Sequence, residues 1–339
     1  MRIDSHTHIG FDPRFYLQGW SPYCADLTRL FLEAGGAKID RFVVFPFIAY
    51  LDLDLNQLRQ DRVALSSDPS AVPYRLENAR LCADIQRAPA QWRERVWPFL
   101  IGDPSRKPAE QVTEWRKLPP DYRVNGLKCQ THTIQAPILD LLDRGRCMLD
   151  FAEERDLPLL IHPSVHPDDH WSQCADILRI VEACPAIRFV LAHSCRFHLP
   201  TLRRVDALPN AWFDCASFIV HCACAERNLP AVALPEERFP ADYSRPDTVL
   251  RDLAEAFPGK LIWGSDAPYY SIEYDRLQIR SSYRAEVACL DALPENLRTR
   301  ACWHNTLAWL RMSESHRDRC APESEVNHAT QGKQKPCQE

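Results

Sequence analysis

The stretch Arg41-Phe42-Val43-Val44-Phe45-Pro46-Phe47 decides the fold class of this chain. Its apolar side chains are nearly continuous instead of alternating with polar ones. A strand of this kind is buried on both faces, which is typical of a parallel sheet that is covered by helices. We therefore predict a buried parallel strand over residues 41–47.

Similar short apolar runs recur along the chain, with helical spacing between them. The triplet Leu27, Leu30 and Phe31 is one example of the i, i+3, i+4 pattern that predicts a helix. Alternating strands and helices over some 310 residues predict an α/β fold, specifically a (β/α)8 TIM barrel, with an open doubly wound sheet as the alternative. The eight predicted strands span residues 2–6, 41–47, 96–101, 124–129, 158–162, 187–193, 211–215 and 261–264.

Two segments are too long to be simple connections. Residues 49–73 and 217–246 follow the second and seventh predicted strands, and we expect both to be long loops at the face where barrel enzymes place their sites. The barrel domain is predicted to span residues 1–312. The tail, residues 313–339, has Val326 as its one aliphatic residue besides alanine and is predicted to be disordered.

Composition excludes several classes of function. The 339 residues are 45% hydrophobic and 26% charged, which is typical of globular proteins. Lys and Arg number 41 against 46 Asp and Glu, a net charge of -5, so no basic excess is available for nucleic acid or an anionic membrane. No apolar run approaches the ~18 residues of a membrane span. Glycine occurs only 10 times, and no glycine-rich phosphate-loop pattern is present.

The 14 cysteines include no CxxC pair, which argues against zinc-ribbon and thioredoxin-like sites. No apolar signal region follows the first residues, so we expect a cytoplasmic protein whose cysteines are reduced and mostly buried. Cys129 and Cys195 lie near the predicted site, but none of the cysteines is needed for it. The pair Cys222 and Cys224 beside His221 resembles a soft-metal cluster only superficially.

Metal-competent side chains stand at the ends of several predicted strands. His6 and His8 are two apart on an extended segment, so both imidazoles point to the same side and suit an ion such as zinc. The pair alone is weak evidence. However, three later apolar runs each terminate in one such residue: His162, His193 and Asp266. Packing gives buried strands no reason to end in this way, so we predict a metal site at the barrel mouth.

The segments Ile3-Asp4-Ser5-His6-Thr7-His8, Gly126-Leu127-Lys128-Cys129 and Trp263-Gly264-Ser265-Asp266-Ala267-Pro268 resemble the amidohydrolase superfamily. The resemblance covers roughly residues 1–312. It points to the amidohydrolase-related (amidohydrolase 2) branch, which includes hydrolases and aminocarboxymuconate-semialdehyde-type decarboxylases.

The resemblance implies a divalent metal, usually Zn²⁺, with Mn²⁺ as the alternative. It implies that His6, His8, His162 and Asp266 bind one metal ion. His193 is then expected to handle a proton or orient water, or to bind a second ion in a two-metal variant.

Two cationic residues are expected to contact the substrate. Lys128 ends the fourth predicted strand, and we rank its roles as substrate-carboxylate contact, buried ion pair, and the carboxylated lysine that bridges two ions in some relatives. An unmodified ammonium must stand off from Zn²⁺ because the two cations repel. Arg196 follows the sixth strand and suits a carboxylate, although a surface arginine is the alternative.

The expected function is a metal-dependent hydrolase that uses a metal-activated water on a small carboxylate, amide or lactone. Asp266 is the expected proton acceptor, and His193 stabilises developing charge or holds the water. A non-oxidative decarboxylase of the same family is the first alternative, and a catalytically inactive barrel acting as a binding protein is the second. We expect a small-molecule substrate, no nucleic-acid or membrane partner, and a homodimer as the candidate assembly.

Overall fold

The computed structural model of this protein describes residues 1–272 and 278–312; the predicted tail, 313–339, lies outside the described residues. Its sheet has the order β2-β1-β3-β4-β5-β6-β7-β8-β9. Each neighbouring pair is parallel except β1 and β2, which are antiparallel. The strands are β1 (Ile3–Phe11), β2 (Cys24–Ala25), β3 (Arg41–Pro46), β4 (Val96–Gly102), β5 (Gly126–Cys129), β6 (Leu159–Ile161), β7 (Phe189–Leu191), β8 (Ala211–Asp214) and β9 (Leu261–Ile262).

Backbone hydrogen bonds join the two ends of the parallel sheet. The His8 N–H donates to the Ala267 carbonyl at 2.6 Å, and the Asp266 N–H donates to the His6 carbonyl at 2.8 Å. A Cβ atom on Gly264 would lie 2.7 Å from the His6 Cβ, so only glycine allows this close approach. These contacts form a seam between β1 and the segment after β9, and they close eight parallel strands into the predicted (β/α)8 barrel.

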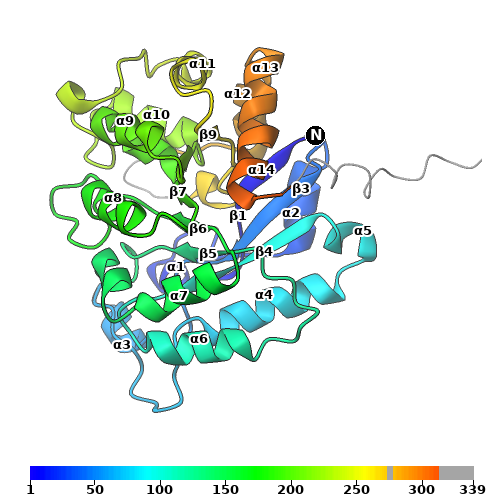
Figure 1. Ribbon diagram of the computed structural model, residues 1–339, viewed down its shortest axis with the longest axis vertical. Helices are drawn as coiled ribbons and strands as arrows, with labels where there is room; N and C mark the ends of the chain where they lie inside the picture. Colours follow the sequence, from blue (N-terminus) through cyan, green and yellow to red (C-terminus); the bar gives the residue numbers. More distant parts are fainter. Residues whose placement is uncertain (273–277, 313–339) are drawn as a thin grey trace, which may run out of the picture.

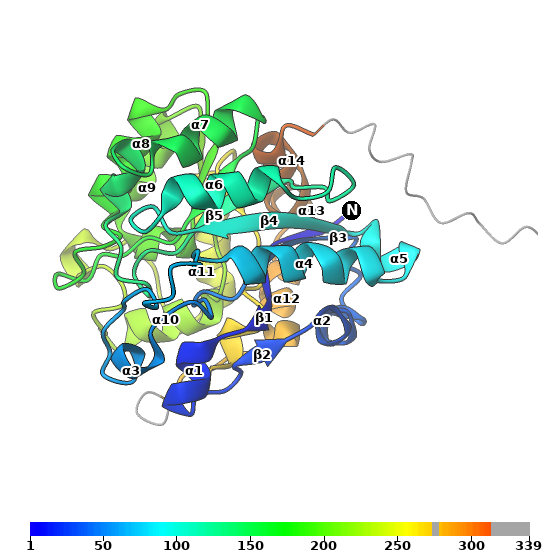
Figure 2. The same ribbon diagram turned by 90° about the horizontal axis from the view of Figure 1, so that it is seen from below.

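Helices surround this sheet, and Figures 1 and 2 show α4 and α6 on the outer side of β4. The helices are α1 (Pro13–Gln18), α2 (Leu27–Ala34), α3 (Leu55–Leu58), α4 (Arg75–Arg87), α5 (Ala90–Arg93), α6 (Pro108–Arg116), α7 (Arg146–Glu154), α8 (Cys174–Ala183), α9 (Leu199–Ala207), α10 (Phe218–Glu226), α11 (Pro246–Ala256), α12 (Tyr283–Asp291), α13 (Glu295–Thr299) and α14 (Asn305–Leu310). No helix among the described residues is long and apolar enough to cross a membrane.

The apolar side chains of β3 belong to two different hydrophobic clusters, one on each side of the strand. Val43 and Phe45 pack inside the barrel in one cluster, while Phe42 and Val44 pack with the helices in another. This division explains why the run is continuous. The interior cluster also contains Leu307 of α14, which fills the end of the barrel at which the strands begin. The opposite end, where the strands finish, is left for polar side chains.

Three predicted details differ from the structure. The first strand extends to Phe11, with an irregular register between Asp4 and Thr7, so His6 and His8 lie within the strand. The short antiparallel β2 was not predicted. Residues 217–246 are not a plain loop, because they begin with α10, and residues 49–73 include α3. Helix α10 carries apolar residues all around and therefore gives no amphipathic stripe in the sequence.

Candidate active site

A cavity of about 340 Å³ opens where the barrel strands end. Its lining includes three cationic residues, Arg14, Lys128 and Arg196, and one carboxylate, Asp266. Aromatic and aliphatic side chains complete the wall. The lining also includes six histidines: His6, His8, His132, His162, His193 and His221.

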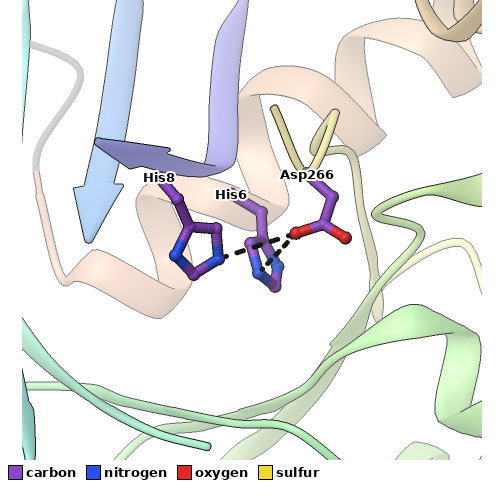
Figure 3. Close-up of side chains that lie close together, drawn as sticks. All are labelled: His6, His8 and Asp266. Carbon is purple, nitrogen blue, oxygen red and sulfur yellow. Dashed lines mark ion pairs between the residues drawn. The ribbon is translucent and has the colours of Figure 1, made fainter. Parts of the chain in front are cut away.

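His6, His8 and Asp266 form a compact cluster in this cavity (Figure 3). One ligand atom from each residue lies within 4.8 Å of the other two, and all three residues are buried. The Asp266 Oδ1 atom is 3.4 Å from the His6 Nε2 atom and 3.6 Å from the His8 Nε2 atom. Among the described residues, this is the group of His, Cys, Asp and Glu side chains whose geometry could hold a metal ion.

Both imidazoles of the cluster are anchored through their other ring nitrogen. The His6 Nδ1 atom is 2.8 Å from a carboxylate oxygen of Asp214, and the His8 Nδ1 atom is 2.7 Å from the Pro46 carbonyl oxygen. Because each Nδ1 must donate to its oxygen partner, each Nε2 carries the free lone pair and faces Asp266. Metal-binding histidines are typically oriented in this way, so the donor set fits a divalent ion.

Asp266 is held with one oxygen toward the histidines. The Ser217 hydroxyl donates to its Oδ2 atom at 2.6 Å, which leaves Oδ1 on the side of His6 and His8. The backbone of Asp266 has a φ of +62°, in the left-handed region, and its N–H is fixed by the seam. Burial raises the pKa of the Asp266 carboxyl above its ordinary value, although the nearby His6 opposes this shift. A carboxyl of this kind is suited to accept a proton.

His162 and His193 form a second group beside this cluster. The His193 ring lies 5.3 Å from that of His6, and its Nε2 atom is 3.0 Å from the His162 Nδ1 atom. The His162 Nε2 atom lies 2.6 Å from the Arg196 guanidinium. Burial, with the charge of Arg196 adding to it, lowers the pKa of both imidazoles well below the ordinary value, so both are neutral at pH 7. Of the four predicted metal ligands, the structure thus brings three together and places His162 alongside.

A left-handed backbone turn carries His193 and Arg196. All five residues from 193 to 197 have φ between +48° and +59°, which is uncommon for residues other than glycine. The turn is held by the Asp214 carboxylate, which accepts from the His193 N–H at 2.8 Å, and by the Arg196 carbonyl, which accepts from the Ala233 N–H at 2.9 Å. With three residues to a turn, His193 and Arg196 meet His162 from two sides.

Arg196 has no carboxylate partner among the described residues. Its guanidinium contacts the Pro163 carbonyl, His162 and the Nε2 atom of His221. Burial lowers the pKa of Arg196, yet a guanidinium stays charged at neutral pH. The cavity therefore contains a positive charge whose partners here are all neutral.

Lys128 lies deep in the same cavity. Its Nζ atom is 3.0 Å from the His6 Nε2 atom and 4.9 Å from the centre of the Phe45 ring. No carboxylate of the described residues is within ion-pair distance of Nζ, so the buried ion pair, the second-ranked role of Lys128, is not formed among them. Burial lowers the pKa of Lys128 to about 8. Lys128 contacts the same lone pair that a metal would use, so a metal at His6 requires this amine to move or to be modified.

Two cavity-related residues escaped the sequence analysis. Asp214 is fully buried and joins His6 to the left-handed turn through its two oxygens. A signal was available, because Asp214 is a polar side chain that ends the otherwise apolar strand β8. Arg14 lies on α1 and donates to the Thr133 carbonyl at 3.0 Å, and its sequence context offers no signal.

The geometry agrees with the comparisons. The model of the amidohydrolase family matches residues 56–312, a range that includes Lys128, His162, His193 and Asp266 but begins after His6 and His8. The comparison with curated proteins gives no match.

Solved structures share the fold at low sequence identity. A zinc-bound amidohydrolase from Burkholderia multivorans is 16% identical with a TM-score of 0.59, and the alignment covers 92% of this chain and 100% of that one. For 5-carboxyvanillate decarboxylase from Sphingomonas paucimobilis the identity is 14% and the TM-score 0.53, with 92% and 99% covered. Dihydroorotase from Campylobacter jejuni is 12% identical with a TM-score of 0.51, and the alignment covers 92% of this chain and 83% of that one. These likenesses show the fold, and the family match over residues 56–312 identifies the chain as a member of the amidohydrolase family.

Proposed function

We propose that this protein is a metal-dependent hydrolase of small carboxylate, amide or lactone substrates. The observation that carries the proposal is the cluster of His6, His8 and Asp266, in which two anchored imidazoles and one carboxylate oxygen converge inside a cavity. Zn²⁺ is the proposed metal, with Mn²⁺ as the alternative, and His162 is the proposed fourth ligand. A divalent ion in such a site lowers the pKa of water from 15.7 to about 7.

Two residues of the chain have the proposed catalytic roles. Asp266 accepts the proton of the attacking water and returns it to the leaving group, since its Oδ1 atom faces the cluster and its carboxyl is poorly solvated. His193 has its Nδ1 atom anchored by the Ala216 carbonyl at 3.0 Å and its Nε2 atom beside His162, and it is the proposed residue that orients the water or the substrate oxygen once His162 turns to the metal.

The cations of the cavity favour an anionic substrate. Arg196 contacts neutral groups, and the Nε atom of Arg14 is buried without a hydrogen-bond partner in the described structure. A substrate carboxylate would supply the negative charge that Arg196 lacks and an acceptor for the Nε atom of Arg14. Lys128 is the third proposed contact for a carboxylate.

Decarboxylation remains the second candidate, because one protein with the same fold is a 5-carboxyvanillate decarboxylase. The same cations would bind the carboxylate that departs. The two reactions are separated by their products: release of CO2 without consumption of water indicates decarboxylation, and a new acid, amine or alcohol indicates hydrolysis. For the whole protein we further propose a cytoplasmic location, a homodimeric assembly and no nucleic-acid or membrane partner.

The substitution Asp266→Asn tests the proposal. It should leave the fold and much of the metal content in place but reduce kcat by about 10²- to 10⁴-fold, because the amide cannot accept the proton of water. Turnover, metal content and circular dichroism are measured together. Asp206→Asn, an exposed position on α9, is the matched control and should have no effect. Near-normal turnover in Asp266→Asn would contradict the assigned role.

A further inference from the structure

His132 stands apart from the other histidines of the cavity. It follows β5 and lines the same cavity as the cluster, but its side chain is 52% exposed, whereas that of His6 is 1% exposed. His132 therefore lies at the mouth, where a product leaves. Its Nδ1 atom is 2.9 Å from a carboxylate oxygen of Asp169, and in the described part of the chain its Nε2 atom has no hydrogen-bond partner.

Asp169 is built to remain ionised and to hold this imidazole. Its side chain is 1% exposed and accepts hydrogen bonds from the Trp171 N–H at 2.7 Å and from the Ser172 hydroxyl at 3.0 Å. Burial alone would raise its pKa, but the hydrogen bonds from His132 and from the Trp171 N–H hold the pKa well below its usual range. The carboxylate therefore keeps its charge at neutral pH.

The anchoring group distinguishes His132 from the other cavity histidines. The Nδ1 atoms of His8, His193 and His221 are held by backbone carbonyl oxygens, and that of His162 by a neutral ring. Of the six histidines that line the cavity, His6 and His132 are the two whose Nδ1 atom is held by a carboxylate of the described residues. His6 belongs to the cluster, so its Nε2 atom is engaged. A carboxylate that holds Nδ1 fixes the tautomer and the orientation of the ring. His132 is thus the cavity histidine that combines a carboxylate-anchored Nδ1 atom with a solvent-exposed side chain outside the cluster.

We propose that His132, positioned by Asp169, is a second proton-transfer residue of this cavity and donates a proton from Nε2 to the leaving group. This inference rests on the proposed hydrolytic function. As the bond from water oxygen to the acyl carbon forms, the water proton passes to Asp266. As the bond to the leaving atom breaks, that atom takes the proton of His132, which replaces the return of the proton from Asp266 described above. Asp266 then releases a proton to solvent and His132 regains one, so one water is consumed in total.

The experiment compares two esters that carry the same free carboxylate. Mono-4-nitrophenyl terephthalate has a leaving group that departs without a proton, whereas mono-methyl terephthalate needs protonation. His132→Gln should lower kcat/KM for the methyl ester by about 100-fold and for the nitrophenyl ester by less than about threefold. Asp169→Asn should show the same preference with a smaller loss. Added imidazole should restore methyl-ester turnover to His132→Ala, because the position is open to solvent.

His166→Gln is the matched control. His166 lies in the loop that also contains Asp169, faces the exposed Asp168 at 4.0 Å and does not line the cavity, so both esters should turn over as in the unsubstituted protein. Equal losses for the two esters in His132→Gln, with no imidazole rescue in His132→Ala, would overturn this inference alone. Failure of the unsubstituted protein to hydrolyse either ester would overturn the proposed hydrolysis, and the role of His132 with it.

Discussion

Anchoring of one ring nitrogen is the common feature of the cavity histidines. The acceptor that holds Nδ1 decides which tautomer is present and therefore where the free lone pair points. In the cluster, Asp214 holds the Nδ1 atom of His6 and the Pro46 carbonyl holds that of His8. The anchors are as much a part of the site as the proposed ligands, and Asp214 is the one whose chemistry a substitution can change.

Asp214→Asn should weaken metal binding by about 10- to 100-fold while the barrel stays folded. The amide oxygen can still accept from the His193 N–H, but its NH2 group then faces the His6 Nδ1 atom. His6 must shift its proton to Nε2 to accept that bond, which removes the lone pair from the cluster. Competition with a chelator of known affinity measures the change.

The conservative control for this prediction is again Asp206→Asn on the exposed face of α9. Unchanged metal affinity in Asp214→Asn would show that the tautomer of His6 is not set by this carboxylate.

The sequence reveals ligands more readily than anchors. His6 and His8 could be predicted because side chains alternate along a strand, and Asp266 because it ends an apolar run. The contact of Asp214 with His6 depends on the register of strands far apart in the chain, and Arg14 reaches the cavity only through the path of α1 after β1. Neither contact leaves a pattern in the neighbouring sequence from which it could be predicted.

At the scale of the elements, the turn of residues 193–197 keeps five consecutive residues other than glycine in the left-handed region. Each residue other than glycine in this region costs about 1–2 kcal/mol relative to its preferred backbone. Hydrogen bonds from the flanking segments hold the turn in place. Ser194 within it is buried, and its hydroxyl has no hydrogen-bond partner among the described residues. Ser194 therefore adds backbone strain, and its side chain makes no hydrogen bond that would offset this strain.

Ser194→Gly should stabilise the protein relative to Ser194→Ala by about 1 kcal/mol, because glycine tolerates positive φ. Both substitutions remove the unpartnered hydroxyl, so their difference isolates the backbone. The free energy of unfolding in urea measures it. Equal stabilities of the two variants would contradict the assignment of a left-handed conformation to this position.

The helices show where patterns succeed and fail. Helix α2 was predictable because its buried residues follow the helical period. Helix α10 was not, since it is packed on most sides and its apolar residues show no period. The left-handed turn also has no sequence signal, as glycine is absent from it. Sequence periodicity thus predicts helices with one solvent-exposed face better than helices that are buried on most sides.

At the scale of the whole molecule, the candidate metal site spans the seam of the barrel. His6 and His8 belong to β1, and Asp266 follows β9. The paired strand β9 has only two residues, so few ladder hydrogen bonds join β8, β9 and β1. An ion bound by all three side chains would therefore add a bond across a sparsely paired part of the sheet.

Removal of the metal should loosen this seam selectively. A ligand present at 100 times its Kd stabilises the state that binds it by about 2.7 kcal/mol, which is roughly a hundredfold in local opening. Amide hydrogen exchange at His8 and Asp266 should accelerate by up to that factor after chelation, because their N–H groups bridge the seam.

The amides of Leu127 and Leu159, which bond within the middle of the sheet, serve as internal controls and should change little. Uniform acceleration across the sheet would indicate a global effect of the metal. Unchanged exchange at His8 and Asp266 would contradict the placement of the ion on this cluster.

The position of the cluster at the seam also determines at which stage of synthesis and folding the cluster can form. During synthesis His6 and His8 leave the ribosome early, while Asp266 appears only after all eight parallel strands have been made. A nascent or truncated barrel can therefore present the two imidazoles but cannot complete the cluster. Tight retention of a metal ion would then report that the final strand has docked, which makes the site a marker of finished assembly.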